Sequence, residues 1–114
     1  MKPFALALLL ALVGPALKAA SVQTQQSIEL KTGSKVQVSY LQYLPEGYAD
    51  DEKKRWPVIL FLHGAGERGN DLNRVKVHGP PKLVESGKKF PFIIISPQCP
   101  RGKGWQSGML LALM

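Results

Sequence analysis

Cysteine is almost missing from this 114-residue chain, since Cys99 is its single example. One cysteine excludes an internal disulfide framework and any zinc site built from several thiolates. Acidic residues are also few: eight Asp and Glu stand against fifteen Lys and Arg, which gives a formal net charge of +7. The basic residues after Arg55 are scattered, and no aromatic side chains alternate with them as a stacking platform would require. We therefore expect no nucleic-acid partner.

Long apolar runs are few, and the longest lies near the start. Phe4 to Val13 is apolar throughout and follows a basic start, which is the pattern of a signal peptide. A membrane-spanning helix needs about twenty apolar residues, and Gly14-Pro15 interrupts the run well before that. We predict a signal peptide at residues 1–21, cleavage after Ser21, and a secreted or periplasmic protein without a stable membrane span. Cleavage after Ala19, an uncleaved membrane anchor and a buried core helix are the alternatives.

The rest of the chain shows two patterns typical of strands. Apolar and polar residues alternate on either side of Thr32-Gly33-Ser34, which predicts an antiparallel hairpin. Two later runs, Val58–Leu62 and Phe92–Ser96, are apolar without alternation, which is typical of parallel strands covered on both faces. Between the hairpin and the first of these runs, residues 48–55 form a polar segment that we expect to be a solvated loop.

Short helices are expected between and after the two apolar runs. The first follows Asn70-Asp71, which offer capping oxygens, and is stopped by Gly79-Pro80-Pro81. A second is expected over residues 82–86, ended by Gly87, and a third begins near Trp105. Strands that alternate with helices predict an α/β fold, with an antiparallel hairpin followed by buried parallel strands and helices on the faces of the sheet.

The glycine-rich segment LFLHGAGERGND, residues 60–71, follows the first apolar run directly. It is not a phosphate-binding P-loop, because Asn70-Asp71 stands where that motif requires lysine and Ser or Thr. Gly64-x-Gly66-x-x-Gly69 matches the dinucleotide fingerprint literally. That fold also needs a helix running back along the sheet and an acid at the end of the next strand, which here ends in Ser96-Pro97-Gln98.

The third function that such a glycine-rich segment can have is an oxyanion hole. A His-Gly pair often introduces an oxyanion hole, and here His63-Gly64 ends the apolar run. Ala65 and Gly66 are small enough for the backbone to approach a substrate oxygen closely.

Three segments carry a family resemblance: YLPEGY, RWPVILFLHGAGERGND and FPFIIISPQCP. Together they resemble the N-terminal part of secreted bacterial α/β hydrolases, the predicted esterases and peptidases related to polyhydroxybutyrate depolymerases and dienelactone hydrolases. The resemblance covers roughly Ser39 to the C-terminus. It implies activity on small or polymeric carboxylic esters, or on peptides, without a cofactor or metal. It also implies that the backbone N–H of Ala65 is an oxyanion donor with Gly66 beside it, and that His63 is structural.

The chain departs from this family in one respect. No Gly-x-Ser-x-Gly motif occurs, and Gly104-Trp-Gln-Ser107-Gly108 has the wrong spacing. In the family, the nucleophile follows the next strand, and the acid and base come later still. We interpret residues 22–114 as the incomplete N-terminal portion of an α/β-hydrolase domain without its triad: a fragment, a truncated gene product or a degraded gene. A non-catalytic secreted binding module and a dinucleotide-binding domain are the alternatives.

Five further residues are candidates for the site. His78 could act as a base, but no serine or acid is placed to complete a triad, so we expect a position at the surface or packed in a loop. Glu67 and Arg68 could contact substrate, cap the following segment or pair with each other. Cys99 has no helix N-terminus or basic partner to activate a thiolate, so we expect a buried loop thiol or half of a disulfide. Trp105 is expected in the core or in a pocket wall.

Overall fold

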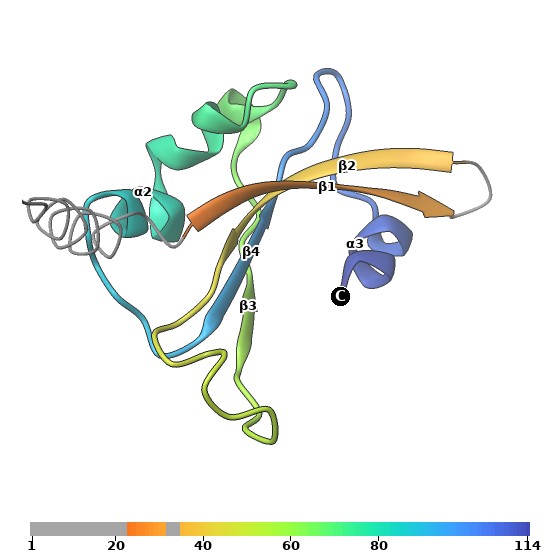
Figure 1. The fold of residues 1–114 in the computed structure, drawn as a ribbon. Helices are drawn as coiled ribbons and strands as arrows, with labels where there is room; N and C mark the ends of the chain where they lie inside the picture. Colours follow the sequence, from red (N-terminus) through yellow and green to blue (C-terminus); the bar gives the residue numbers. More distant parts are fainter. Residues whose placement is uncertain (1–22, 32–34) are drawn as a thin grey trace, which may run out of the picture.

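A mixed four-stranded sheet with short helices packed against it forms the fold (Figure 1). The structure is a computed structural model that describes residues 23–31 and 35–114, so the predicted signal peptide and the turn at Thr32-Gly33-Ser34 lie outside the described residues. The elements in chain order are β1 (Gln23–Lys31), β2 (Lys35–Tyr43), β3 (Val58–Leu60), the 3-10 helices η1 (Ala65–Glu67) and η2 (Leu72–Val77), α2 (Gly79–Glu85), β4 (Ile93–Pro97) and α3 (Ser107–Leu113).

The strand order is β1-β2-β4-β3, so β4 lies between two strands that precede it in the chain. β1 and β2 pair antiparallel, which confirms the predicted hairpin. β2 and β4 are also antiparallel, with Tyr43 opposite Ile94. β3 and β4 are parallel, with Val58 opposite Ile93. The carboxyl ends of β3 and β4 therefore meet at the same edge of the sheet, where α/β proteins place their binding groups.

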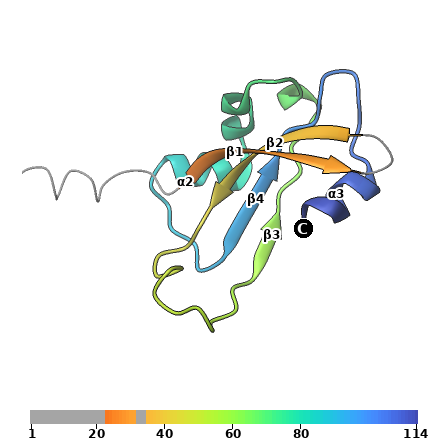
Figure 2. The same ribbon diagram turned by 45° about the vertical axis from the view of Figure 1, so that its right-hand side comes forward.

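One face of the sheet is covered by η2 and α2. Leu72 and Val75 of η2 pack on Leu41 of β2, because an amphipathic turn buries its apolar side against the strand. Val84 of α2 packs on Tyr43 and Ile94, and Phe61, Phe90 and Phe92 close the edge of this cluster. Figure 2 shows η2 and α2 together on this side of the sheet. The predicted placement of helices on the sheet is thus confirmed for this face.

Among residues 23–31 and 35–114, the opposite face is covered only at the hairpin end. There, Met109 of α3 packs on Leu30 and Val38. Farther along, β2, β4 and β3 border a hollow of about 260 Å³ whose walls include Tyr40, Ile95 and Val58. The sheet therefore has one helix-covered face and one face that is largely open.

Burial of both apolar strands on both faces was expected, and for β3 this expectation is wrong. The strand is three residues long, and its first two side chains, Val58 and Ile59, are 42% and 39% exposed. β4 is intermediate: Ile94 and Ser96 are buried, whereas Ile93 and Ile95 are half-buried. The physical reason is position: β3 is the edge of the sheet, so its side chains have a neighbouring strand on one side only, and no described helix covers the face on which Val58 lies.

The helices between the strands begin and end differently from the prediction. Asp71 caps η2 as expected, since its Oδ1 accepts a hydrogen bond from the N–H of Asn73 at 3.0 Å. Gly79-Pro80-Pro81, expected only to stop this helix, forms the first turn of α2, so the second helix begins at Gly79 instead of residue 82. Proline suits a first turn because its missing N–H would have had no helical partner there. Gly87, with φ of +100°, follows the helix as predicted.

The connection between β2 and β3 is a solvated loop, as predicted. Every side chain from Glu46 to Arg55 is exposed. Trp56 ends the exposed stretch, with the ammonium of Lys54 3.9 Å from its ring centroid. Within residues 23–31 and 35–114, none of the helices combines the length and apolar character needed to cross a bilayer.

Candidate functional site

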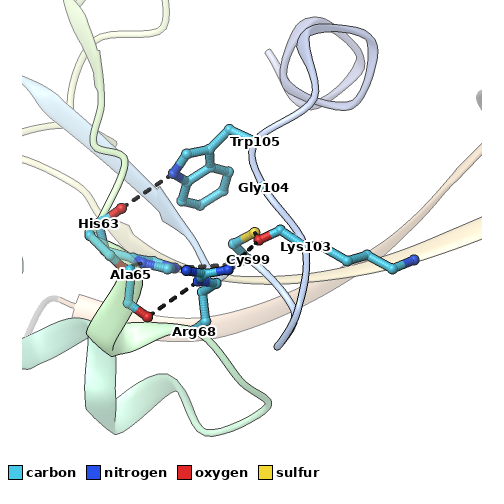
Figure 3. A pocket seen from close by; sticks show the side chains of 8 residues that line it. His63, Ala65, Arg68, Cys99, Lys103, Gly104 and Trp105 are labelled. Atoms are coloured by element: carbon cyan, nitrogen blue, oxygen red, sulfur yellow. Dashed lines mark hydrogen bonds between the residues drawn. The ribbon is translucent and has the colours of Figure 1, made fainter.

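Two loops meet at the carboxyl edge of the parallel strands and enclose a small cavity (Figure 3). The first, residues 63–69, follows β3 and is called the glycine loop below. The second, residues 98–105, follows β4 and is called the cysteine loop. The cavity between them measures about 210 Å³, and its walls include His63, Ala65, Arg68, Cys99 and Trp105.

His63 is buried at the base of the cavity and connects the two loops. The residue is only 3% exposed, and its Nε2 accepts a hydrogen bond from the N–H of Cys99 at 2.9 Å. Because Nε2 is an acceptor, the ring proton lies on Nδ1, which is 2.6 Å from the carbonyl oxygen of Gly64. The indole ring of Trp105 packs edge to face on the imidazole, with 4.8 Å between the ring centroids, and its Nε1–H donates to the His63 carbonyl. Both ring nitrogens are occupied, so His63 is arranged as a structural group and has no free nitrogen to act as a base.

Further hydrogen bonds fix the glycine loop against the cysteine loop. Arg68 donates from Nε to its own loop at Ala65 O (3.2 Å) and from Nη1 across to Lys103 O (3.0 Å). The N–H of Gly69 donates to the carbonyl of Cys99 at 3.0 Å. The buried side chain of Gln98 donates to the carbonyls of Glu67 (2.9 Å) and Asp71 (2.8 Å), one within and one just beyond the glycine loop. The backbone of this loop is therefore held in one arrangement before any ligand arrives.

Two of the three backbone N–H groups of η1 remain free. In the described part of the chain, the N–H groups of Ala65 and Gly66 donate to no acceptor. Their neighbours are all bonded: Gly64 N to the Glu67 carboxylate, Glu67 N to Gly64 O, and Arg68 N to Ala65 O. Helical turns leave their first N–H groups without partners, and such groups favour negative charge. Ala65 borders the 210 Å³ cavity, whereas Gly66 lies in an adjoining hollow.

The other candidates take the following positions. Glu67 and Arg68 do not pair with each other, because both bind backbone groups. Cys99 is a buried free thiol whose Sγ contacts the Lys103 carbonyl at 3.2 Å, as expected for a loop thiol. His78 is exposed at the surface, and Trp105 lines the cavity wall, both as predicted.

The dinucleotide interpretation does not fit this geometry. The segment that contains Gly64, Gly66 and Gly69 forms only the three-residue helix η1. A pyrophosphate site of that type needs a long helix that begins at the loop and packs along the sheet. The glycines of this loop instead serve a tight turn that exposes backbone donors.

Sequence reasoning missed the contribution of the cysteine loop. Gln98 and the carbonyl of Lys103 hold the glycine loop, and Gly104 lines the cavity, yet none of the three was singled out. A usable signal was present, because both apolar runs were predicted to be parallel strands. Loops that follow adjacent parallel strands lie at one edge of the sheet, so PQCPRGKGW was a candidate for the same site.

Comparison with known proteins agrees with the fold. A solved structure described as a thermostable esterase matches 75% of this chain with a TM-score of 0.53 and 23% sequence identity. This chain spans about a quarter of that protein, since the match covers 23% of the solved chain. No known family model and no curated protein matches the sequence. The chain therefore has an α/β, esterase-like fold.

Proposed function

We propose that this chain supplies the first strands and the oxyanion loop of a serine hydrolase that acts on carboxylic esters or peptides. In that mechanism, a serine attacks the carbonyl carbon, a histidine accepts the serine proton, and backbone N–H groups stabilise the negative charge that develops on the carbonyl oxygen. The glycine loop provides the last of these functions. Ala65 is the donor nearest the cavity, and Gly66 follows it.

The observation that carries this proposal is the pair of free N–H groups in a rigidly held turn. An oxyanion donor must be unpaired before the reaction and must not move when charge develops, since reorganisation would cost part of the stabilisation. The hydrogen bonds from Arg68 and Gln98 support the second condition, because they hold the carbonyls of the first and last residues of η1. The esterase-like fold supports the proposal, since that fold places such a loop at the end of the third strand.

Substitution at position 65 tests the donor role. In a longer hydrolase that carries the same loop and a serine nucleophile, Ala65→Pro removes the N–H outright. Because one oxyanion donor contributes about 3–4 kcal/mol, we expect kcat to fall by about 10²–10³. Ala65→Gly is the matched control, as it keeps the N–H and changes one methyl group. Hydrolysis of p-nitrophenyl acetate measures both variants.

Two results would contradict this assignment. One is an equal loss of kcat in the proline and glycine variants when circular dichroism shows that both are folded. The other is measurable ester hydrolysis by the 114-residue chain itself, for which we expect none above the buffer rate. No Gly-x-Ser-x-Gly nucleophile occurs in its sequence, and neither histidine bonds a serine in the described residues.

A non-catalytic binding module is the second candidate. The observation that favours it is the same lack of a nucleophile beside a formed cavity and free donors. Such a module would bind carboxylate or ester groups at the Ala65 and Gly66 N–H groups without turnover. Sequencing the coding region beyond Met114 distinguishes the two, since an open frame with a Gly-x-Ser-x-Gly motif supports the hydrolase.

Export from the cytoplasm belongs to the same proposal. A signal peptide at residues 1–21 would deliver the hydrolase to polymeric or extracellular esters. We expect N-terminal sequencing of exported protein to begin at Val22, and cleavage after Ala19 would give Ala20 instead. An intact Met1 on a membrane-bound product would overturn the export proposal.

A further inference from the structure

We propose that the chain holds an anion-binding subsite beside the glycine loop, so that the substrate of the proposed hydrolysis carries a carboxylate or phosphate group. The subsite is a hollow of about 410 Å³ lined by Ala65, Gly66, Gly102 and three arginines, Arg68, Arg74 and Arg101. This inference rests on the proposed function for its link to a substrate, because the hollow shares Ala65 and Arg68 with the cavity described above.

The three arginines come from three separate parts of the fold. Arg68 follows η1, Arg74 lies in η2, and Arg101 lies in the cysteine loop after β4. Their convergence on one hollow is therefore a product of the tertiary structure, since no basic run in the sequence produces it. Guanidinium groups present forked donors that match carboxylate and phosphate oxygens, which makes arginine the usual side chain for recognising these groups.

Arg68 is positioned by the protein itself. Its Nε and Nη1 donate to the carbonyls of Ala65 and Lys103, so one edge of the guanidinium is fixed between the two loops. A side chain that is already ordered loses little conformational freedom when it binds a ligand. Arg74 and Arg101 are exposed and form no hydrogen bond or ion pair among the described residues, so their donors are available.

No carboxylate of the described residues forms an ion pair with these three arginines. Glu67 directs Oε1 to the N–H of Gly64, and Asp71 directs Oδ1 to the N–H of Asn73. The two ion pairs of the described residues, Lys76–Glu85 and Lys89–Glu46, involve no arginine. Gly66, whose N–H donates to no acceptor in the described residues, lines the same hollow as the three arginines. The hollow therefore combines unpaired positive charge with a backbone donor.

The position of the hollow indicates the substrate class. A carbonyl oxygen that accepts from the Ala65 N–H would lie at the border of the two cavities. A group a few bonds away would then enter the arginine hollow. Esters that carry an anionic group close to the reacting carbonyl fit this arrangement, whereas purely apolar esters leave the arginines without a partner.

The test is a titration of the 114-residue chain with inorganic phosphate, followed by ¹⁵N–¹H NMR. Binding requires no turnover, so the result does not depend on catalysis. We expect saturable shifts at the amides of Gly66 and Gly102, and about tenfold weaker binding in Arg74→Gln and in Arg101→Gln, because each removes one charge-assisted donor. Arg55→Gln is the matched control, since Arg55 is exposed in the loop before β3 and its loss changes the net charge equally. Succinate in place of phosphate shows which anion is preferred.

Equal weakening in Arg55→Gln and Arg74→Gln, or shifts that do not saturate, would overturn the subsite. Failure of the proposed function is a different result. Both variants can be made in a longer hydrolase with this loop. If Ala65→Pro loses activity and Arg74→Gln has an unchanged KM for a succinyl monoester, the oxyanion role is supported and the subsite is rejected. Saturable phosphate binding with no effect of Ala65→Pro on kcat keeps the subsite and rejects the oxyanion role.

Discussion

His63 and His78 show how differently the same side chain can serve in one small fold. His63 is buried and accepts from the N–H of Cys99, whereas His78 is exposed and its side chain does not cap α2. Removal of the His63 ring leaves a buried N–H without a partner and takes away the surface on which Trp105 packs. The two histidines therefore form a matched pair for measuring what the connection between the loops contributes.

We expect His63→Ala to lower the free energy of unfolding by about 1–3 kcal/mol through the unsatisfied Cys99 N–H alone. His78→Ala should change it by no more than about 0.5 kcal/mol, as is usual for exposed residues without partners. Urea unfolding followed by Trp fluorescence measures both variants. A His63→Ala midpoint equal to that of His78→Ala would show that the loops are held together without the imidazole.

The structural role of His63 was available from the sequence only through the family resemblance, and its partners were not. The bond to Cys99 requires β4 to lie directly beside β3, and apolar runs do not encode the order of strands. Ala65 and Gly66 were easier to single out, because small residues in a glycine-rich turn after an apolar strand allow the backbone to approach a ligand closely. The roles of Gln98 and Lys103 depend on that unpredicted strand order as well.

At the scale of elements, the contact between Gly79 and Phe61 sets the start of α2. Gly79 has φ of +64°, a conformation that side chains with a Cβ adopt rarely. A Cβ at this position would lie 2.7 Å from two ring atoms of Phe61, which itself packs in the core between β2 and the helices. The first turn of α2 thus approaches the sheet as closely as a residue without a side chain permits.

Gly79→Ala is expected to destabilise the fold by about 1–3 kcal/mol, the cost of overpacking together with an unfavourable φ. Gly87→Ala separates the two causes, because Gly87 also has positive φ but has no atom within 4 Å of the added Cβ. Gly108→Ala, in α3 with open space around it, should instead stabilise the helix by up to about 1 kcal/mol. Thermal melts of the three variants measure these differences, and equal losses at positions 79 and 87 would exclude the Phe61 contact as a cause.

The elements themselves were largely predictable, and their burial was not. Alternation fixed the hairpin, and Asp71 and Gly87 marked helix ends, because these signals are local. The apolar run Val58–Leu62 indicates a strand that could be covered on both faces, but coverage depends on helices elsewhere in the molecule. For this reason the sequence predicted β3 correctly as a parallel strand and wrongly as a buried one.

At the scale of the whole molecule, β3 leaves a sheet edge unpaired. Pro57 O and Phe61 N bond with β4, so by alternation the backbone groups of Val58 and Leu60 point away from the sheet. Val58 and Ile59 are also exposed, and Val58 borders the hollow on the uncovered face. An exposed apolar edge of this kind is a template for pairing with another strand.

We expect the 114-residue chain to be marginally stable and to self-associate through this edge at tens of micromolar concentrations. Val58→Lys should shift it toward the monomer, because a charge at the edge opposes strand pairing. Val77→Lys is the matched control: Val77 is 50% exposed at the end of η2, on the other face of the sheet. Analytical ultracentrifugation measures the distribution. A dilute monomer with a sharp two-state melt, or dissociation by Val77→Lys and not by Val58→Lys, would refute edge pairing.

The strand order also has a consequence in time. During synthesis the ribosome releases β3 before β4, yet β3 has no hydrogen-bonded neighbour until β4 inserts between it and β2. Non-local pairings of this kind form slowly, because the entropy of closing a long loop is lost before the stabilising contacts form. A nascent chain that has not yet reached Ile93 can complete only its hairpin. Val58–Leu60 then remains a loose apolar segment, available to a chaperone or to a neighbouring nascent chain.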